Sequence, residues 1–428
     1  MVLKFKIHAF LALLITSIFL GFITGMPMNS IIQSVAEGMG STLGFVATVV
    51  GIGAIFGQML ESSGGAESLA HYLIKKFGKE KAPHALTITG FIVGIPIFLD
   101  VGFIILVPVI YALAKDIKKS LLYFAIPLLA GLAVTHAFVP PTPGPVATTE
   151  IIGADFGWVM IFGLLIGIPV AFIAGPIFGK YISNKIYVEL PRTFDATERK
   201  DMPSFWSVAA IIAIPLLLIL ANTVSGVLAR VFNISDNFWL DLVSFIGHPF
   251  IALLIATFIA IYFMGIKQGF TKETILQLST KSLAPAGLII LVTGAGGVFK
   301  QLLIDSGIGI QLAESMSHSA MPPIVLAYLI AMLIRVSQGS ATVAMITSAG
   351  IVSPLLATLA LSEPHKALIV IAIAAGATTA SHVNDSGFWL VGKYLGMTEK
   401  QTLQSWTVME TIISVTGFAL ALLLSLFF

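Results

Sequence analysis

A small set of ionisable and amide side chains lies inside long apolar stretches of this sequence. The set consists of Asp100, His136, Arg335, His382, Asn384 and Asp385. Placing a charged side chain in hydrocarbon costs on the order of a few kcal/mol, so such residues predict a functional site. A guanidinium group can hold a carboxylate through two hydrogen bonds, and carboxyl or imidazole groups can exchange protons. These residue types therefore predict a site for a small hydrophilic anion and for protons.

Each ionisable residue of the set also has a structural interpretation. Arg335 could bind a substrate carboxylate, or it could donate to carbonyl groups of its own segment. Asp100 could carry a proton or pair with a basic group. His136 and His382 could relay protons or act as hydrogen-bonding struts, and we favour the strut for His136. The predicted proton-coupling residues are Asp100, His136, His382 and Asp385.

Amide and hydroxyl side chains near the same interruptions are candidates for substrate binding. We favour a binding or coupling role for Asn384 and Asp385, because their cost at membrane depth is otherwise unexplained. Ser340 and Thr342 could line the site or merely satisfy the backbone around them. The predicted substrate-binding residues are Arg335, Ser340, Thr342, Thr142, Ser381, Asn384 and Ser386.

The composition fixes the environment in which these residues must be positioned. Hydrophobic residues make up 57% of the 428 residues and charged residues 10%, against about 25% charged in soluble domains. The mean hydropathy is +0.99. The chain contains no cysteine, which excludes disulfides and thiolate metal sites. We expect an all-α integral membrane protein with no metal, no cofactor and no nucleic-acid partner.

Nine apolar runs are predicted to cross the bilayer, on the criterion of roughly 20 apolar residues. Their approximate limits are 7–25, 43–62, 120–139, 155–179, 204–229, 240–266, 283–303, 366–380 and 405–428. Two further stretches, 85–114 and 322–360, are too long for one helix and are interrupted by polar or helix-breaking residues. Each stretch could form two spans or one re-entrant hairpin that enters and leaves on the same side.

The distribution of basic residues favours the hairpins. With both stretches as hairpins and the N-terminus inside, most of the 23 Lys and Arg residues lie on the inner side. The predicted outer segments contain none of them, and these are 26–42, 149–154, 231–239 and 314–321. This asymmetry obeys the positive-inside rule and predicts a multi-pass protein of the cell membrane with a cytoplasmic N-terminus.

An internal repeat relates the two halves of the chain. Seven of the fourteen positions in 51–64 are identical in 294–307, at an offset of 243 residues. Basic residues flank the two copies on opposite sides, which predicts inverted repeats of the kind found in secondary transporters. The predicted organisation is a first repeat over 1–180, a cytoplasmic linker over 181–203, a connecting transmembrane helix over 204–232 and a second repeat over 233–428.

Each repeat contains a second interruption. The first lies in 135–145, where four prolines occur within six residues, and the second lies in 380–387. Proline lacks an amide donor and clashes with the preceding helical turn, so these helices must be discontinuous. At membrane depth, non-helical backbone persists only where protein or a water-filled cavity surrounds it. The ends of broken helices there create polarised binding sites.

Four segments together resemble the signatures of the gluconate permease family. They are 98–108 (FLDVGFIILVP), 136–145 (HAFVPPTPGP), 339–344 (GSATVA) and 381–389 (SHVNDSGFW), and 404–417 resembles the last helix of that family. Thr142 stands where many members have histidine. The resemblance implies proton-coupled uptake of a sugar acid such as gluconate, or in some relatives of D-serine and other small hydroxy or amino acids. It also implies two re-entrant hairpins and elevator-type alternating access.

Two other function classes are compatible with single features of the sequence. Ser340 and His382 could form the catalytic pair of an intramembrane serine protease, but that would not explain the matching interruptions in the first half. An ion channel usually places its selectivity elements on an oligomeric axis, whereas this chain repeats its elements within one subunit. A secondary transporter is therefore favoured. No Gly-x-x-x-x-Gly-Lys-Ser/Thr motif is present, so we expect an ion gradient, protons before sodium, and a homodimer.

Overall fold

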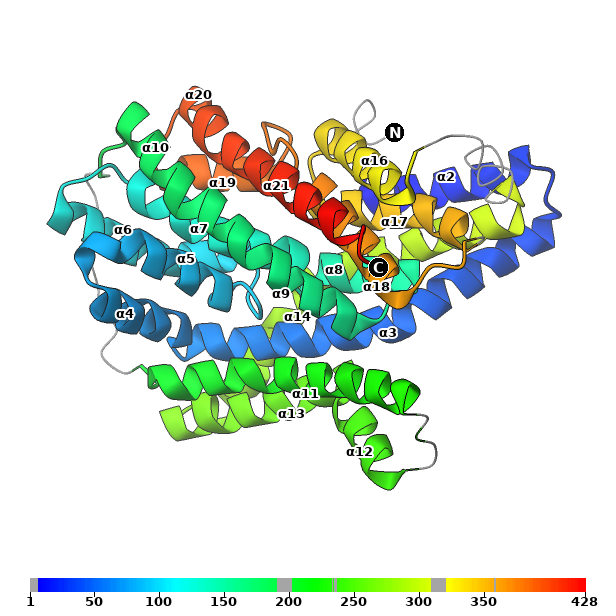
Figure 1. Ribbon diagram of the computed structural model, residues 1–428, viewed down its shortest axis with the longest axis horizontal. Coiled ribbons are helices and arrows are strands. Elements are labelled where there is room, and N and C mark those ends of the chain that lie inside the picture. Colours follow the sequence, from blue (N-terminus) through cyan, green and yellow to red (C-terminus); the bar gives the residue numbers. More distant parts are fainter. Residues whose placement is uncertain (1–6, 191–201, 233, 235–236, 309–320, 358) are drawn as a thin grey trace.

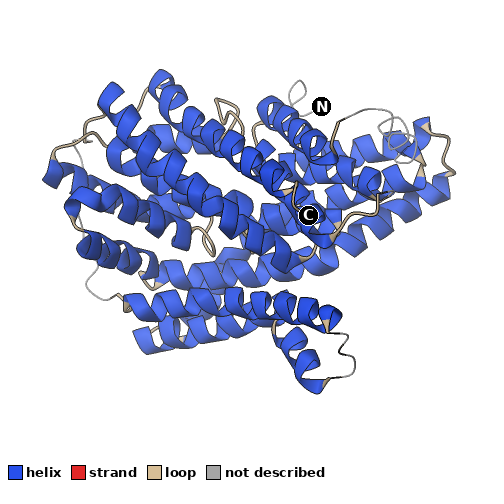
Figure 2. Cartoon of the chain, viewed as in Figure 1, coloured by secondary structure: helices blue, strands red, loops and turns tan. Residues whose placement is uncertain are grey.

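The computed structural model describes residues 7–190, 202–232, 234, 237–308, 321–357 and 359–428. Every regular element within these ranges is a helix, which confirms the predicted all-α fold class (Figure 2). Much of the predicted linker, and the segment that would match α4 of the first half, lie outside the described residues.

The helices follow one another with short connections. In the first half they are α2 (Ala9–Ile23), α3 (Met28–Ser62), α4 (Gly65–Phe77), the 3-10 turn η1 (Lys79–Lys81), α5 (Ala82–Val93), α6 (Leu99–Ile117), α7 (Leu122–Phe138), α8 (Pro143–Ile152), α9 (Phe156–Phe172), the π-helical η2 (Ile173–Ile177) and α10 (Phe178–Lys185). The connecting helix is α11 (Phe205–Val231).

The second half has a similar series. It contains α12 (Phe238–Ile246), α13 (Pro249–Ala260), η3 (Ile261–Gly265), η4 (Ile266–Gln268), α14 (Lys272–Asp305), α16 (Pro323–Gln338), α17 (Ala341–Leu356), α18 (Glu363–Gly376), α19 (Ser386–Tyr394), α20 (Glu399–Thr402), the π-helical η5 (Leu403–Thr407) and α21 (Val408–Leu424).

Seven helical runs within the described ranges are long and apolar enough to cross a bilayer. They are Met28–Ser62, Leu122–Ile152, Phe156–Lys185, Phe205–Ala229, Pro249–Gln268, Lys272–Asp305 and Glu399–Leu424. Two other predicted spans form the shorter helices α2 and α18, of 15 and 14 residues. The chain therefore has the helices of a multi-pass membrane protein.

Both interrupted stretches fold as two helices separated by a break. The stretch 85–114 lies in α5 and α6, which are separated by 94–98, and the stretch 322–360 contains α16 and α17, which are separated by 339–340. The predicted second interruptions are also present. One separates α7 from α8 at 139–142, and the other separates α18 from α19 at 377–385.

Helices occur in a matching order in the two halves. The long helix α3 corresponds to α14, the pair α5–α6 to α16–α17, the pair α7–α8 to α18–α19, and α9 with α10 to α20 with α21. The last pair of each half is joined by a π-helical turn, η2 between α9 and α10 and η5 between α20 and α21. The order of the helices thus follows the repeat seen in the sequence. The opposite orientation of the halves and the exact domain limits stay predictions.

The spans predicted at 43–62 and 283–303 begin much earlier in the structure, so these predicted limits were wrong. The segment 26–42 forms the start of α3, a helix of 35 residues, and most of 267–281 belongs to α14, a helix of 34 residues. At 1.5 Å per residue each helix is about 50 Å long, well beyond the roughly 30 Å of the hydrocarbon core. Polar and charged residues lower the hydropathy of both segments, and the small residues of 26–42 also allow close helix packing.

Two other predicted boundaries also differ from the structure. The single span predicted at 240–266 is divided at 247–248 into α12 and α13, because the His248 side chain accepts from the Phe250 amide and Pro249 starts a new helix. Helical structure continues to Lys185, beyond the start predicted for the linker at residue 181.

The helices α3 and α14 cross closely at small residues, in the first half of α3 and the last third of α14. A Cβ atom on Gly38 would lie 2.7 Å from the carbonyl oxygen of Gly297, and one on Gly297 would lie 2.1 Å from Oγ1 of Thr42. Ser34 of α3 also donates to Asp305 of α14 at 2.6 Å. In Figure 1, α3 extends from the left of centre to the right edge of the molecule, with α11 and α13 along one side and the interrupted helices on the other.

We expect Gly38→Ala to lower the melting temperature of the detergent-purified protein. The added methyl group would press on the backbone of α14, and overpacking of this kind typically costs about 1–3 kcal/mol. Gly40→Ala is the matched control, because Gly40 lies on the same helix and a Cβ atom there meets nothing within 4 Å. A Gly38→Ala protein that melts at the same temperature as Gly40→Ala would contradict the close crossing.

Candidate functional site

A buried ion pair joins the second hairpin to the second interrupted helix. Nη2 of Arg335 lies 2.6 Å from Oδ2 of Asp385, and the two side chains are 3% and 14% exposed. Arg335 is in the last turn of α16, and Asp385 precedes α19, where its Oδ1 accepts from the Gly387 amide at 3.1 Å. Two residues predicted separately to bind substrate and protons are therefore direct partners.

The segment between α18 and α19 is held in place by η5 and the start of α21. Nε1 of Trp406 donates to Oγ of Ser381 at 2.7 Å, and this hydroxyl donates to Oδ2 of Asp385 at 2.5 Å. The hydroxyl of Thr407 donates to the Ser381 carbonyl, and the Ala380 amide donates to Thr411 at 3.2 Å. The non-helical backbone here is satisfied by side chains of one neighbouring helix, which fixes the orientation of Asp385.

The tip of the second hairpin touches the same segment. Gly339 has a φ of 88°, and a Cβ atom there would lie 2.2 Å from the Asn384 carbonyl oxygen. Nδ2 of Asn384 donates to the Val336 carbonyl at 2.9 Å, and Nε2 of His382 lies 3.0 Å from the same oxygen. Asn384 and His382 therefore satisfy the free carbonyl end of α16, which is the structural alternative considered for His382.

We expect Gly339→Ala to impair both folding yield and transport. A methyl group would force the hairpin tip away from Asn384, in addition to the strain of roughly 1–2 kcal/mol for a non-glycine residue in the left-handed region. Gly396→Ala is the matched control, because Gly396 has a φ of 65° but open space around its Cα. Equal losses in the two variants, measured by yield and substrate uptake, would show that the tip contact itself is unimportant.

The hydroxyl residues predicted for substrate binding have different surroundings. Oγ of Ser340 accepts from the Val343 amide at 3.3 Å and so caps α17, which is one of the two roles considered for it. Oγ1 of Thr142 donates to the Val139 carbonyl at 2.7 Å and is buried. Ser386 is exposed. A Cβ atom on Gly144 would lie 4.0 Å from the Cα of Thr342, so the start of α8 lies against the start of α17.

In the first half, the predicted proton-coupling residues do not form a comparable cluster. His136 of α7 packs its ring edge-on against Phe98 at a centroid distance of 6.4 Å, and its buried Nδ1 has no hydrogen-bond partner among the described residues. Asp100, in the first turn of α6, is exposed. The first half therefore supplies a histidine and a carboxylate near its breaks but no ion pair between them.

Glu410 of α21 is a further buried carboxyl group that the sequence patterns did not predict. Its side chain is 4% exposed, and its Oε1 has no hydrogen-bond partner among the described residues. Of the Asp, Glu, Lys and Arg side chains that the structure describes, just Arg335 and Glu410 are fully buried. The sequence feature that could have identified Glu410 is that it is a lone acidic residue within the predicted last span, 405–428.

Arg335 has binding capacity that the described residues do not use. Its Nε and Nη1 atoms are buried and have no partner among them, whereas Nη2 is bound to Asp385. Buried polar groups are normally paired. Each edge of a guanidinium combines Nη2 with either Nε or Nη1, so a carboxylate can bind the edge that Asp385 does not occupy, through one of the unpaired atoms and the second N–H of Nη2. The cluster can therefore bind a carboxylate beside a second carboxylate that is already present.

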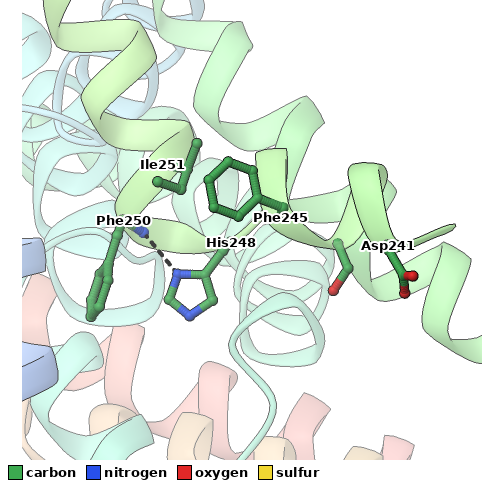
Figure 3. Close-up of a pocket in the computed structure, with 6 residues that line it drawn as sticks. Asp241, Phe245, His248, Phe250 and Ile251 are labelled. Atoms are coloured by element: carbon green, nitrogen blue, oxygen red, sulfur yellow. Dashed lines mark hydrogen bonds between the residues drawn. The ribbon is translucent and has the colours of Figure 1, made fainter. Parts of the chain in front are cut away.

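Two cavities in the part of the chain that the structure describes lie away from the Arg335–Asp385 cluster. One of about 390 Å³ lies at the corner between α12 and α13 and is lined by Asp241, Ser244, Phe245, His248, Phe250 and Ile251 (Figure 3). A second of about 250 Å³ lies between α3, α11 and the loop after α8, with Glu150 and Asp155 in its wall. Neither contains a predicted site residue, and no group of three or more potential metal ligands occurs within the described ranges.

Comparison with known proteins decides the family. The family model described as GntP family permease matches residues 1–427 of this chain. The chain belongs to the GntP permease family. The resemblance noted in the sequence is thus confirmed, and this GntP permease is a membrane transporter and not an enzyme, so the protease alternative is wrong.

Named relatives of this GntP permease cover nearly its whole length. The gluconate permease of Pseudomonas aeruginosa is 42% identical over 100% of this chain and 94% of its own. The low-affinity gluconate transporter of Escherichia coli K12 is 40% identical over 97% of this chain and 93% of its own. The Gnt-II system L-idonate transporter of the same strain is 37% identical over 97% and 94%.

A solved structure supports the fold of this GntP permease. The YdaH transporter of Alcanivorax borkumensis, described as having an unusual topology, superposes with a TM-score of 0.66 and covers 97% of this chain and 98% of its own. Its sequence identity is 14%, so the comparison concerns the fold alone.

Proposed function

We propose that this GntP permease imports gluconate, or a closely related sugar acid, together with protons. The observation that carries the proposal is the buried Arg335, whose Nε and Nη1 have no partner among the described residues while Nη2 binds Asp385. A sugar acid supplies one carboxylate for the free guanidinium edge. Its several hydroxyl groups can exchange hydrogen bonds with nearby side chains, such as Asn384.

The relatives support an aldonic acid as the substrate class. Two of them are named for gluconate and one for L-idonate. These acids share a terminal carboxylate on a polyhydroxylated chain, which is the chemistry that Arg335 and the surrounding hydroxyl and amide groups fit. Proton coupling is supported by the titratable groups beside the site, which are Asp385 and His382, and by the lack of a nucleotide-binding motif.

Elevator-type alternating access fits the packing between the long helices and the hairpins. A Cβ atom on Gly57 of α3 would lie 2.2 Å from the Pro96 carbonyl oxygen at the first hairpin, and one on Gly296 of α14 would lie 2.2 Å from Cγ2 of Ile346 in α17. Glycine faces of this kind present few side chains that would obstruct sliding. We propose that α3 and α14 belong to a fixed scaffold, with the hairpins and broken helices as the moving unit.

We also propose that the protein lies in the cell membrane as a homodimer with its N-terminus in the cytoplasm. The concentration of Lys and Arg on one predicted side supports the orientation. A fixed dimer would give the scaffold a base against which the other helices move. Protease accessibility of an N-terminal tag in sealed vesicles tests the orientation, and mass measurement of the detergent-solubilised protein tests the dimer.

Uptake of labelled gluconate into proteoliposomes tests the proposed transport. We expect accumulation when the outside is more acidic than the inside, loss of accumulation with a protonophore, and no requirement for a sodium gradient. Unlabelled gluconate and L-idonate should compete, whereas D-serine should not. Accumulation that follows sodium and ignores the protonophore would overturn proton coupling, and preferential competition by D-serine would overturn the sugar-acid assignment.

A further inference from the structure

One face of η5 and α21 carries a continuous polar stripe toward the broken helix. The stripe consists of Trp406, Thr407, Glu410, Thr411 and Ser414. Spacings of three and four residues place side chains on the same face of a helix. The first two donate to Ser381, and Thr411 accepts from the Ala380 amide. Ser414 is within hydrogen-bond distance of Thr379, at 2.6 Å, and of Tyr328, at 3.1 Å.

Glu410 lies in the middle of this stripe and differs from its neighbours. Every other member of the stripe has a hydrogen-bond partner in residues 379–381. Oε1 of Glu410 has no partner among the described residues. Its side chain is 4% exposed. A structural carboxylate at such a depth would normally be satisfied by donors, because an unpaired buried charge is costly.

Hydrogen bonds of the neighbouring side chains lead from the surroundings of Glu410 to the candidate site. Trp406, four residues before Glu410, donates to Ser381, whose hydroxyl donates to Asp385. Asp385 pairs with Arg335, so Glu410 adds a second carboxyl group near one shared cation. His136 of α7 is a further titratable group, and its ring packs against Phe98 near the first break. No hydrogen bond connects Glu410 directly to the ion pair in the described residues, so Glu410 acts on the pair through its charge.

The charge balance of this cluster depends on the proton of Glu410. With Glu410 protonated, Arg335 and Asp385 neutralise each other, and an incoming carboxylate adds one negative charge. With Glu410 ionised, the cluster already carries a net negative charge, and a second anion would meet strong repulsion in a poorly solvated space. Burial also makes the ionised form of any carboxyl group the costlier one.

We propose that Glu410 is the carboxyl group that carries the coupling proton. The inference rests on the proposed symport of a sugar acid with protons. On the side of uptake, the Glu410 carboxylate takes one proton from water, and the neutral acid allows the substrate carboxylate to bind the free edge of Arg335. After the conformational change the substrate leaves, and Glu410 returns its proton to water on the other side. One proton thus accompanies one anion, and no bond other than the O–H bond forms or breaks.

The test compares net uptake with exchange in proteoliposomes that contain the full-length protein. Net uptake of labelled gluconate driven by a pH gradient requires the proton to be released in each cycle. Counterflow, in which internal unlabelled gluconate exchanges for external label, lets the protonated carrier return without releasing it. Glu410→Gln keeps the shape and the neutral charge of the protonated acid. We expect net uptake to fall on the order of 100-fold, a usual effect of removing a group that transfers a proton, while counterflow stays close to wild type.

The matched control is Glu399→Gln, because Glu399 lies in the same terminal helical run but is exposed. It should leave both activities unchanged. Glu410→Gln with normal pH-driven uptake would overturn the proposal, and so would loss of counterflow together with net uptake, which would indicate a positioning or folding role. Wild-type protein that shows no gluconate uptake or exchange would overturn the proposed function itself, and with it this role of Glu410.

A second variant keeps the proposal testable if Glu410→Gln does not fold. Glu410→Asp retains a titratable carboxyl group but withdraws it by one methylene from Arg335 and Asp385. Because a carboxyl group titrates according to its surroundings, the pH dependence of net uptake should shift relative to wild type. A pH profile that coincides with that of wild type would overturn the assignment.

Discussion

Arg335→Lys is expected to reduce the initial rate of gluconate uptake by at least about 100-fold. Lysine keeps the positive charge beside Asp385, but it cannot present the planar pair of N–H groups that a carboxylate accepts. A hydrogen bond to a charged group contributes roughly 1.5–3 kcal/mol, and 1.4 kcal/mol corresponds to a factor of about ten. Losing two such bonds to the substrate is therefore sufficient for the expected effect.

Measuring uptake as a function of gluconate concentration identifies the step that is lost. Lys115→Arg provides a control for the reciprocal exchange at an exposed position of α6. Its uptake should match that of wild type. If Arg335→Lys transported gluconate with nearly wild-type rate and affinity, a bidentate contact from Arg335 to the substrate would be excluded.

The paired substitution Gly296→Cys with Ile346→Cys should abolish uptake under oxidising conditions and restore it on reduction. A Cβ atom built on Gly296 lies 3.7 Å from Cβ of Ile346, within the usual range of about 3.5–4.5 Å for disulfides. The branched side chain that approaches Gly296 most closely is removed by the second substitution. A bond here would fix α14, in the proposed scaffold, to α17 of the second hairpin.

The absence of native cysteine makes this experiment unambiguous. Each single variant should transport gluconate in both redox states, and a mobility shift after proteolysis between α14 and α17 should report bond formation. Full transport by the cross-linked protein would show that α14 and α17 do not move relative to each other. The boundary of the proposed moving unit would then have to lie elsewhere.

Several features of the site could be predicted, because the sequence shows charged or helix-breaking residues where they are energetically costly. Arg335 and Asp385 lie in apolar surroundings, where a charged side chain requires a partner or a function. The interruptions could be located from the prolines of 135–145 and the polar run of 380–387. The pairing of Arg335 with Asp385 could not be deduced, because it depends on how the hairpin tip packs against Asn384.

Other features escaped prediction for identifiable physical reasons. The burial of Glu410 could not be predicted, because one carboxyl group in a long apolar run gives no indication of which way it faces. Its burial follows from the packing of α21 on α18. The first turns of α3 contain small and polar residues that lower the hydropathy, although the same residues permit close contact with α14. The exposure of Asp100 could not be predicted either, because it is decided by the neighbouring helices and not by the apolar residues beside it in sequence.

The close crossing of Gly38 and Gly297 also constrains how the protein is made. During synthesis α3 leaves the ribosome with its glycine face uncovered, and the helix that covers it is translated only after the rest of the first half, the connecting helix, α12 and α13. The two halves therefore cannot mature one after the other as independent units. The early helices must remain loosely assembled in the bilayer until α14 arrives, and final compaction is an event of the complete polypeptide.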